Sequence, residues 1–288
     1  MKQLLERTHR KLGLRVELVA ITSDGDRDQQ SVLKDWGGVG VFVKELEHAL
    51  TDKRIDLAVH SLKDLPIKQP RGLMWAAVPV REDVRDVAVT RSGKRLRDLP
   101  MGAVIGTGSP RRRVQLQSTY THLSFAEIRG HVETRLRKVR DGAVDGTLLA
   151  RAGLKRLGLL KKIKTETLPL EILLPAPGQG ALAVECRSRD KLTRRLLAAI
   201  QDPKLTACVE CERACLAALG GGCQLPLGAY ADFHGNHKHL RLRAVLASSN
   251  GCLTRFEGSG PKNNPRALGR RGAKWLSATK NTQAQRDS

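Results

Sequence analysis

The sequence predicts an α/β protein with a smaller α+β domain at its C-terminal end. In the first two thirds of the chain, apolar strand patterns alternate with helical patterns, which is typical of parallel or mixed sheets covered by helices. In the last third, three strand-like runs follow one another with short turns, which indicates a three-stranded antiparallel sheet. The segment 173–180 (LLPAPGQG) is rich in Pro and Gly and marks the crossover between these parts.

The predicted elements fall into three domains along the chain. The first comprises residues 1–80 and 181–198, with strands at 16–23, 55–61 and 73–80 and helices at 41–50 and 189–200. The second comprises residues 86–174, with strands at 86–91, 103–109, 123–129 and 146–151 and helices near 110–118 and 132–140. The third comprises residues 203–288, with a helix at 203–219, strands at 226–233, 240–248 and 252–258, and a helix near 265–277.

The charge of the chain favours a multiply anionic ligand. Lys and Arg number 51 against 29 Asp and Glu, which gives a formal net charge of +22. A polynucleotide would suit this charge, but so would any other polyanion. Aromatic residues make up only 3% of the chain, so stacking surfaces for single-stranded nucleic acid are scarce. We expect a small-molecule partner and no nucleic acid, although the charge by itself would suit either.

The composition indicates a globular protein of a reducing compartment. Six cysteines are too few for a disulfide scaffold of 288 residues, which favours the cytoplasm. No apolar run approaches the ~18 residues that a membrane span requires, and the first residues lack the apolar core of a secretory signal. We expect no membrane partner and a monomer.

The segment 106–116 (GTGSPRRRVQL) is the clearest candidate for an anion site. A predicted strand ends in Gly106, and Ser109 followed by Pro110 is a favoured helix start. Free N–H groups at a helix start bind carboxylates and phosphates alike. The arginines at 111–113 oppose the helix dipole there unless an anion lies between them. A capped surface helix with solvated arginines is the alternative interpretation.

Two other segments place polar residues directly after predicted strands. Arg129 precedes Gly130 at the carboxyl end of a predicted strand, which is where parallel sheets bind ligands. In 59–66 (VHSLKDLP), one strand-to-loop junction holds His60, Ser61, Lys63 and Asp64. A carboxylate beside a lysine could stabilise a cation and transfer protons. An ordinary Asp-Leu-Pro turn is the alternative, and the pattern alone favours it.

The cysteines near residue 210 suggest either a metal site or a core stripe. Cys208, Cys211 and Cys215 share one face of a predicted helix, where small apolar side chains are expected in a core. Zinc sites normally place a C-x2-C pair on a turn, so we expect no metal. Cys223 differs, because GGGCQLP places it on a Gly-rich loop with room for a covalent attachment.

Taken together, these segments resemble the porphobilinogen deaminase family, also called hydroxymethylbilane synthase. The matching runs lie in the family order and cover nearly the whole chain from about residue 16: GGVGVFVKELEHAL, DLAVHSLKDLP, REDVRDVAV, IGTGSPRRRVQL, EIRGHVETRL, LARAGLKRLGL, PAPGQGALAVECR and CERACLAALGGGCQLPLGAYA. The resemblance implies two periplasmic-binding-protein-like domains and a third domain that carries a cysteine loop. It also implies a transferase of tetrapyrrole and heme biosynthesis, which condenses four porphobilinogen molecules into hydroxymethylbilane and releases ammonia from each.

The resemblance assigns roles to residues of this chain. It implies that a dipyrromethane cofactor is bound covalently through a thioether to Cys223 and that Asp64 is the catalytic carboxylate. The residues implied for binding the cofactor are Lys63, Thr107, Ser109, Arg111, Arg112 and Arg129. The residues implied for binding the substrate are Ser61, Arg135, Arg156 and Gln179. Each pyrrole carries an acetate and a propionate, so a growing chain needs many Arg and Lys contacts.

The chain departs from the family pattern near its start. Family members begin with a strand and an Arg-x-Ser-x-Leu-Ala motif, whereas this sequence begins within the first helix, so we expect the first strand of domain 1 to be missing. Val39 replaces a lysine of the glycine loop, and His131 replaces an asparagine after Arg-Gly. These changes predict a folded chain with weakened activity. An inactive homologue and a basic solute-binding or polyanion-binding protein are the alternatives.

Overall fold

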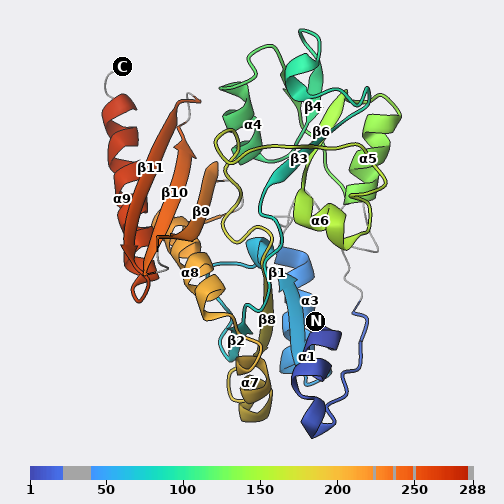
Figure 1. The fold of residues 1–288 in the computed structure, drawn as a ribbon, viewed down its shortest axis with the longest axis vertical. Helices are drawn as coiled ribbons and strands as arrows, with labels where there is room; N and C mark the ends of the chain where they lie inside the picture. Colours follow the sequence, from blue (N-terminus) through green and yellow to red (C-terminus); the bar gives the residue numbers. More distant parts are fainter. Residues whose placement is uncertain (22–39, 223–224, 236–237, 249–250, 285–288) are drawn as a thin grey trace. The chain divides into compact units, whose positions relative to one another are not determined.

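The structure is a computed structural model of the chain, shown in Figure 1. It describes residues 1–21, 40–222, 225–235, 238–248 and 251–284. The chain divides into two compact units. Unit 1 comprises residues 1–81 and 181–206, and unit 2 comprises residues 82–180 and 207–288. Among the described residues, no helix is long and apolar enough to cross a membrane.

Unit 1 is built on a three-stranded sheet. Its strands, in spatial order, are β1 (Leu57–Ser61), β8 (Leu182–Arg187) and β2 (Leu73–Ala77), and both pairings are antiparallel. On one face, Val184 and Cys186 pack with Leu5 of α1 (Lys2–Thr8) and Leu197 of α7 (Lys191–Ala198). On the other face, Ala58 packs with Leu50 of α3 (Gly40–Thr51). The helices therefore cover both faces, as the strand–helix alternation predicts.

The strand predicted at 16–23 is wrong for the residues that the structure describes, 16–21, which have no regular secondary structure. Leu18 and Val19 are 77% and 51% exposed, and the amide of Val16 donates to a carboxylate oxygen of Glu6 at 3.0 Å. An apolar run becomes a strand only where a neighbouring strand satisfies its backbone groups. Val39 and positions 22–23 lie outside the described residues.

Unit 2 contains a five-stranded sheet in the order β5-β4-β6-β3-β7. These strands are β3 (Asp86–Thr90), β4 (Val104–Gly106), β5 (Ser124–Ala126), β6 (Gly146–Ala150) and β7 (Glu166–Thr167). β4 runs parallel to β5 and β6, whereas β3 runs antiparallel to β6 and β7, so the sheet is mixed. The helices are α4 (Pro110–Gln117), α5 (Val132–Arg140) and α6 (Arg151–Arg156). The predicted helices at 110–118 and 132–140 are confirmed.

A second sheet of unit 2 is antiparallel throughout, in the order β11-β10-β9. Its strands are β9 (Leu227–His234), β10 (His239–Ala247) and β11 (Leu253–Pro261), and the helices that accompany it are α8 (Pro203–Ala218) and α9 (Pro265–Ala284). The mixed α/β class with a three-stranded antiparallel C-terminal part is therefore confirmed. Each predicted domain has its own sheet, and the division of unit 2 into two domains stays a prediction.

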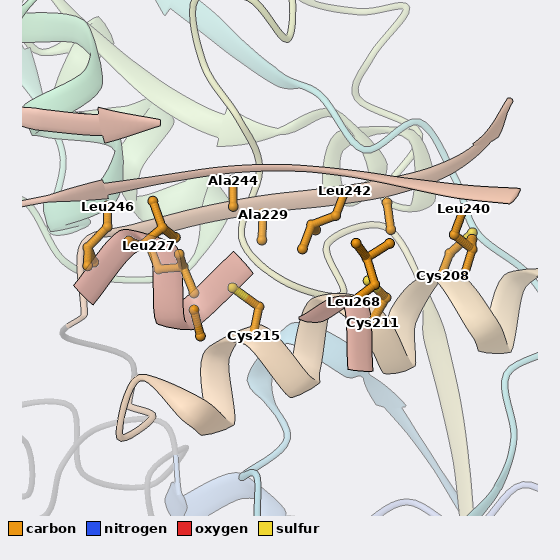
Figure 2. Packing of buried hydrophobic residues seen from close by; sticks show 13 residues of the cluster. Cys208, Cys211, Cys215, Leu227, Ala229, Leu240, Leu242, Ala244, Leu246 and Leu268 are labelled. Carbon is orange, nitrogen blue, oxygen red and sulfur yellow. The ribbon is translucent and has the colours of Figure 1, made fainter. Parts of the chain in front are cut away.

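The cysteine stripe of α8 faces this second sheet (Figure 2). Cys208, Cys211 and Cys215 are buried and point toward Leu227, Leu240, Leu242 and their neighbours on the strands. Burial raises the pKa of the Cys215 thiol to about 12 and raises that of Cys211 further, so both stay protonated at neutral pH. Their interpretation as core side chains is confirmed. In the described part of the chain, no group of three His, Cys, Asp or Glu side chains could hold a metal ion.

Candidate functional site

The turn after β1 presents Lys63 and Asp64 on a short 3-10 helix, Leu62–Asp64. Leu62 and Leu65 are buried on either side of this pair, and the amide of Leu62 donates to the carbonyl of Ala181 at 3.0 Å. Because these leucines anchor the turn, Asp64 is exposed and Lys63 is half-buried. Ser61, the last residue of β1, is also exposed. The turn therefore holds an accessible carboxylate on a fixed backbone.

Beneath the turn lies a buried polar pair. Strand alternation turns His60 inward, where its Nε2 lies 3.1 Å from Oε2 of Glu185 on β8. Both side chains are almost fully buried. Burial, followed by the charge of Glu185, raises the pKa of nearby Glu47 on α3. The pair joins β1 to β8, so His60 acts in the scaffold of the turn.

In unit 2, the candidate residues follow the carboxyl ends of three parallel strands. Thr107 and Ser109 come after β4, Arg129 comes after β5, and Arg156 ends the helix that follows β6. Carboxyl ends of parallel strands meet at one edge of a sheet, which is where ligands bind in α/β folds. Asp86 begins β3, which is antiparallel to β6, so it lies at the same edge. Sequence reasoning had placed Arg129 at such an edge but had not included Asp86.

The start of α4 has the predicted form. Ser109 is the residue before the helix and Pro110 is its first residue, although the Ser109 hydroxyl makes no capping hydrogen bond. Thr107 is buried, and its Oγ1 accepts a hydrogen bond from the amide of Ser109 at 3.2 Å. The strand must pass close to Ile128, because a Cβ on Gly106 would lie 2.7 Å from Cδ1 of that residue. Thr107 therefore shapes the turn, and the Ser109 hydroxyl is left for a ligand.

Arg111 and Arg112 are not solvated, contrary to the surface-helix alternative, and are only 5% and 6% exposed. Both bind Asp86, which is fully buried. Nη1 of Arg111 lies 2.9 Å from Oδ2, and Nη2 of Arg112 lies 2.7 Å from Oδ1. Arg111 also donates to the carbonyl of Leu174 at 2.6 Å, and Arg112 to that of Leu148 at 3.0 Å. The two guanidinium groups are thus held rigidly by the protein itself.

Gln179 belongs to the same network. It is buried, and its Nε2 donates to the carbonyl of Val84 at 2.7 Å and to Oδ1 of Asp86 at 3.1 Å. The next residue, Gly180, has a φ of +84°, and a Cβ there would meet the carbonyl oxygen of Glu82 at 2.5 Å. These contacts favour a structural role for Gln179 in the crossover segment over the substrate binding that the resemblance implies.

Arg111, Arg112 and Asp86 together carry a net positive charge. Two buried guanidinium groups share the single carboxylate of Asp86, which leaves one net positive charge among these three residues. Burial lowers the pKa of Arg111, the Asp86 charge raises it, and the Arg112 charge lowers it further. Arginine nevertheless stays protonated in proteins. A buried, uncompensated cation at a helix start is suited to bind one carboxylate of a ligand.

The other predicted arginines are less enclosed. Arg129 is exposed and pairs with Glu127, with 2.7 Å between Nη2 and Oε1. Nε of Arg135 donates to the carbonyl of Gly130 at 2.8 Å, and burial, followed by the charge of Arg112, lowers its pKa. Nη2 of Arg156 donates to the carbonyl of Gly180 at 2.7 Å. These contacts orient the arginines and leave further N–H donors for anionic groups.

Cys223 lies outside the described residues, between α8 and β9. Glu212 of α8, which sequence reasoning missed, is fully buried nearby in the chain. Its Oε2 accepts from the amide of Gly178 at 2.7 Å, and its Oε1 accepts from the amide of Ala231 at 2.9 Å. Glu212 therefore ties the crossover segment to β9. In the sequence, the signal for Glu212 is a charged residue on the apolar face of a predicted helix.

Two models of one protein family match most of the chain. A family model described as "Porphobilinogen deaminase, dipyromethane cofactor binding domain" matches residues 1–195, and one described as "Porphobilinogen deaminase, C-terminal domain" matches residues 206–278. Among solved structures, an arginine-binding protein from T. maritima is 16% identical over 69% of this chain and 75% of its own, with a TM-score of 0.36. A probable amino-acid-binding protein from Bacillus subtilis is 10% identical over 69% and 78%, with a TM-score of 0.42. Likenesses this weak support no conclusion about this chain.

Curated relatives are much more similar. The porphobilinogen deaminase of Sorangium cellulosum is 50% identical over 239 residues, which cover 83% of this chain and 78% of that protein. The porphobilinogen deaminase of Chromobacterium violaceum is 46% identical over 264 residues, which cover 91% and 84%. With both family models and these identities over most of its length, the chain belongs to the porphobilinogen deaminase family.

Proposed function

We propose that this chain condenses four porphobilinogen molecules into hydroxymethylbilane, with Asp64 as its catalytic carboxylate and Cys223 as the attachment point of dipyrromethane. The observation that carries this proposal is the accessible Asp64 carboxylate, on a turn anchored by two buried leucines. Loss of ammonia from porphobilinogen leaves an electron-poor, protonated azafulvene. At ~4 Å and an effective dielectric constant near 20, a carboxylate stabilises such a cation by about 4 kcal/mol before desolvation is counted.

Asp64 is also suited to the proton transfer that completes each condensation. The attacking pyrrole carbon loses a proton after the new carbon–carbon bond forms, and an exposed carboxylate can accept it. Neither function requires Asp64 to be buried, so its exposure on the turn is consistent with both.

The start of α4 fits the dipyrromethane cofactor. When bound, this group supplies the free pyrrole carbon to which substrate units are added. The buried arginine pair with its net positive charge suits one carboxylate of the cofactor, and the Ser109 hydroxyl and the α4 start supply neutral donors. We assign Thr107 and Gln179 to shaping this region, because both are buried and hydrogen-bonded within the protein.

The more exposed cations suit the substrate and the growing chain. Arg129 and Arg135 keep free N–H groups at the edge of the five-stranded sheet, and Arg156 lies on the helix after β6. We propose that they bind the acetate and propionate groups of incoming pyrroles, with Ser61 and Lys63 assisting near Asp64. We also propose that the protein acts as a monomer and that it works in the cytoplasm, a reducing compartment that suits its sparse cysteines.

The covalent cofactor provides the sharpest test. Purified protein should give the colour of a dipyrromethane with acidic dimethylaminobenzaldehyde, and Cys223→Ser should abolish it. Cys252→Ser is the matched control, because Cys252 is another cysteine of unit 2 and is half-buried beside β11. This variant should keep the colour. A colourless wild-type protein, or colour retained in Cys223→Ser, would contradict the proposal.

A further inference from the structure

We propose that unit 2 carries a second ligand site, for a small apolar molecule with an acidic group, in a groove beneath α5. The groove has a volume of about 820 Å³ and is formed by the end of β3 and its following turn, one face of α5, and residues 159–164. Small-molecule sites usually measure roughly 300–1,000 Å³ and combine an apolar lining with a few convergent polar groups. The groove matches this description in size and in lining.

The groove is separate from the candidate site at the start of α4. β3 begins at Asp86, beside the end of β6, and ends at Thr90, beside the start of β6 and so at the opposite edge of the sheet. Thr90 lines the groove, whereas Asp86 holds the arginine pair. Arg135, which we assign to the substrate, is not among the α5 residues that line the groove. A ligand here would therefore not occupy the position proposed for the cofactor.

The floor of the groove is apolar and only partly covered. Leu136, Leu159 and Ile163 are half-buried and pack on a core that contains Val89. Burying these side chains under an apolar body would favour binding, because apolar surface is removed from water. This lining favours a ligand with a ring or an alkyl body over a simple inorganic anion.

The rim of the groove is basic. It contains Arg91, Arg137, Arg140 and Lys164 against the single carboxylate of Glu133. Arg91 pairs with Asp145 and Arg140 with Asp141, whereas within the described part of the chain Arg137 and Lys164 form no ion pair. This charge excess favours a ligand with an anionic group.

Two of these cations lie close to glycines with positive φ. A Cβ on Gly93 would lie 3.1 Å from Cδ of Lys164, so the lysine stem lies against the turn after β3. A Cβ on Gly142 would lie 2.9 Å from Nη1 of Arg91, so a side chain there would displace that guanidinium. Both glycines therefore leave room for these cations to lie against the backbone of the rim.

Anilinonaphthalene sulfonate is a suitable probe, because it combines an apolar ring system with one acidic group. Titration of the whole protein, followed by fluorescence, should show saturable binding. Arg137→Glu/Lys164→Glu should weaken it by about tenfold or remove one binding equivalent, because two attractive charges become repulsive. Arg137→Gln/Lys164→Gln should have an intermediate effect, and far-ultraviolet circular dichroism should show that both variants are folded.

A second basic groove provides the matched control. In unit 1, a smaller groove of about 420 Å³ is lined by Lys191 and Arg195 of α7 and by Met74. Lys191→Glu/Arg195→Glu makes the same charge change and should leave the tight binding unchanged. Equal weakening in both double variants, or binding unaffected by Arg137→Glu/Lys164→Glu, would overturn the proposal. This experiment measures binding alone, so its outcome does not depend on the proposed reaction.

Discussion

The turn after β1 and the start of α4 hold their charged groups in opposite ways. In unit 1, buried Leu62 and Leu65 anchor the backbone, and the Asp64 carboxylate is exposed. In unit 2, Arg111 and Arg112 are themselves buried, and a carboxylate of the protein holds them. Apolar anchors leave a reacting group free to exchange protons, whereas buried ion pairs fix a binding group in one orientation. The contrast matches the roles proposed for catalysis and for cofactor binding.

The largest expected effect on stability is at Asp86. Asp86→Asn removes the counter-ion of two buried guanidinium groups, which should lower the free energy of unfolding of unit 2 by about 3–5 kcal/mol. Urea denaturation, with amide exchange of β3 and β6, measures this loss. Asp98→Asn is the control, because Asp98 is exposed and lies 3.5 Å from Arg97. A similar loss in both variants would show that the arginine pair does not depend on Asp86.

At Asp64 we expect a large effect on activity and a small effect on stability. Asp64→Asn should reduce porphobilinogen consumption by about 100-fold or more relative to the unsubstituted chain, because one preorganised electrostatic contact is lost. The free energy of unfolding should change little, since the side chain is exposed. Asp52→Asn, at another exposed carboxylate of unit 1, should retain activity. Unchanged turnover in Asp64→Asn would show that Asp64 is not the catalytic carboxylate.

A smaller effect is expected at Glu212, a buried carboxylate that accepts hydrogen bonds from two backbone amides. Glu212→Gln turns an amide NH₂ toward the N–H of Gly178 or Ala231, which should cost about 1–3 kcal/mol. Hydrogen exchange at these two amides should become faster. Glu210→Gln on the same helix removes only the charge of the partly exposed pair with Arg266 and should cost less than about 1 kcal/mol. If both variants behave alike, Glu212 does not hold the crossover segment.

The smallest expected effect is on the stability of unit 1 at acid pH, through Asp190 at the start of α7. The hydrogen bond from the Thr193 amide, more than any other contact, lowers the pKa of Asp190 from 3.8. The stabilisation by the Asp190 carboxylate is therefore complete above pH 3.8. It is lost as the pH falls through the lower pKa that Asp190 has in the folded state. Asp190→Ala should cost about 1 kcal/mol at neutral pH and flatten this dependence.

Asparagine at the same position separates the cap from the charge. Asp190→Asn can still accept the Thr193 amide, so it should recover most of the stability at neutral pH without restoring the acid dependence. Urea midpoints measured between pH 3 and pH 7 test this for the three forms. An unaltered acid dependence in both variants would contradict the assignment to Asp190.

Local patterns predicted much of the fold. The helix expected at 132–140 has those bounds in the structure, and the three C-terminal strands lie within three residues of their predicted positions. Side-chain periodicity and helix-start residues act over a few positions, so they are readable without tertiary contacts. β8 was missed as a strand, although it is central in the sheet of unit 1. Its partners are β1 and β2, more than 100 positions away in the chain.

The candidate site divides in the same way. The sequence by itself determined the chemistry available: an aspartate after a buried strand, adjacent arginines at a helix start, a cysteine on a glycine-rich loop, and the ordered motifs that indicate the family. Only the tertiary structure decided that Arg111 and Arg112 share Asp86, that Thr107 and Gln179 bind within the protein, and that Asp64 is exposed. Whether a charge is solvated or paired depends on groups distant in sequence, which folding alone brings within a few ångströms.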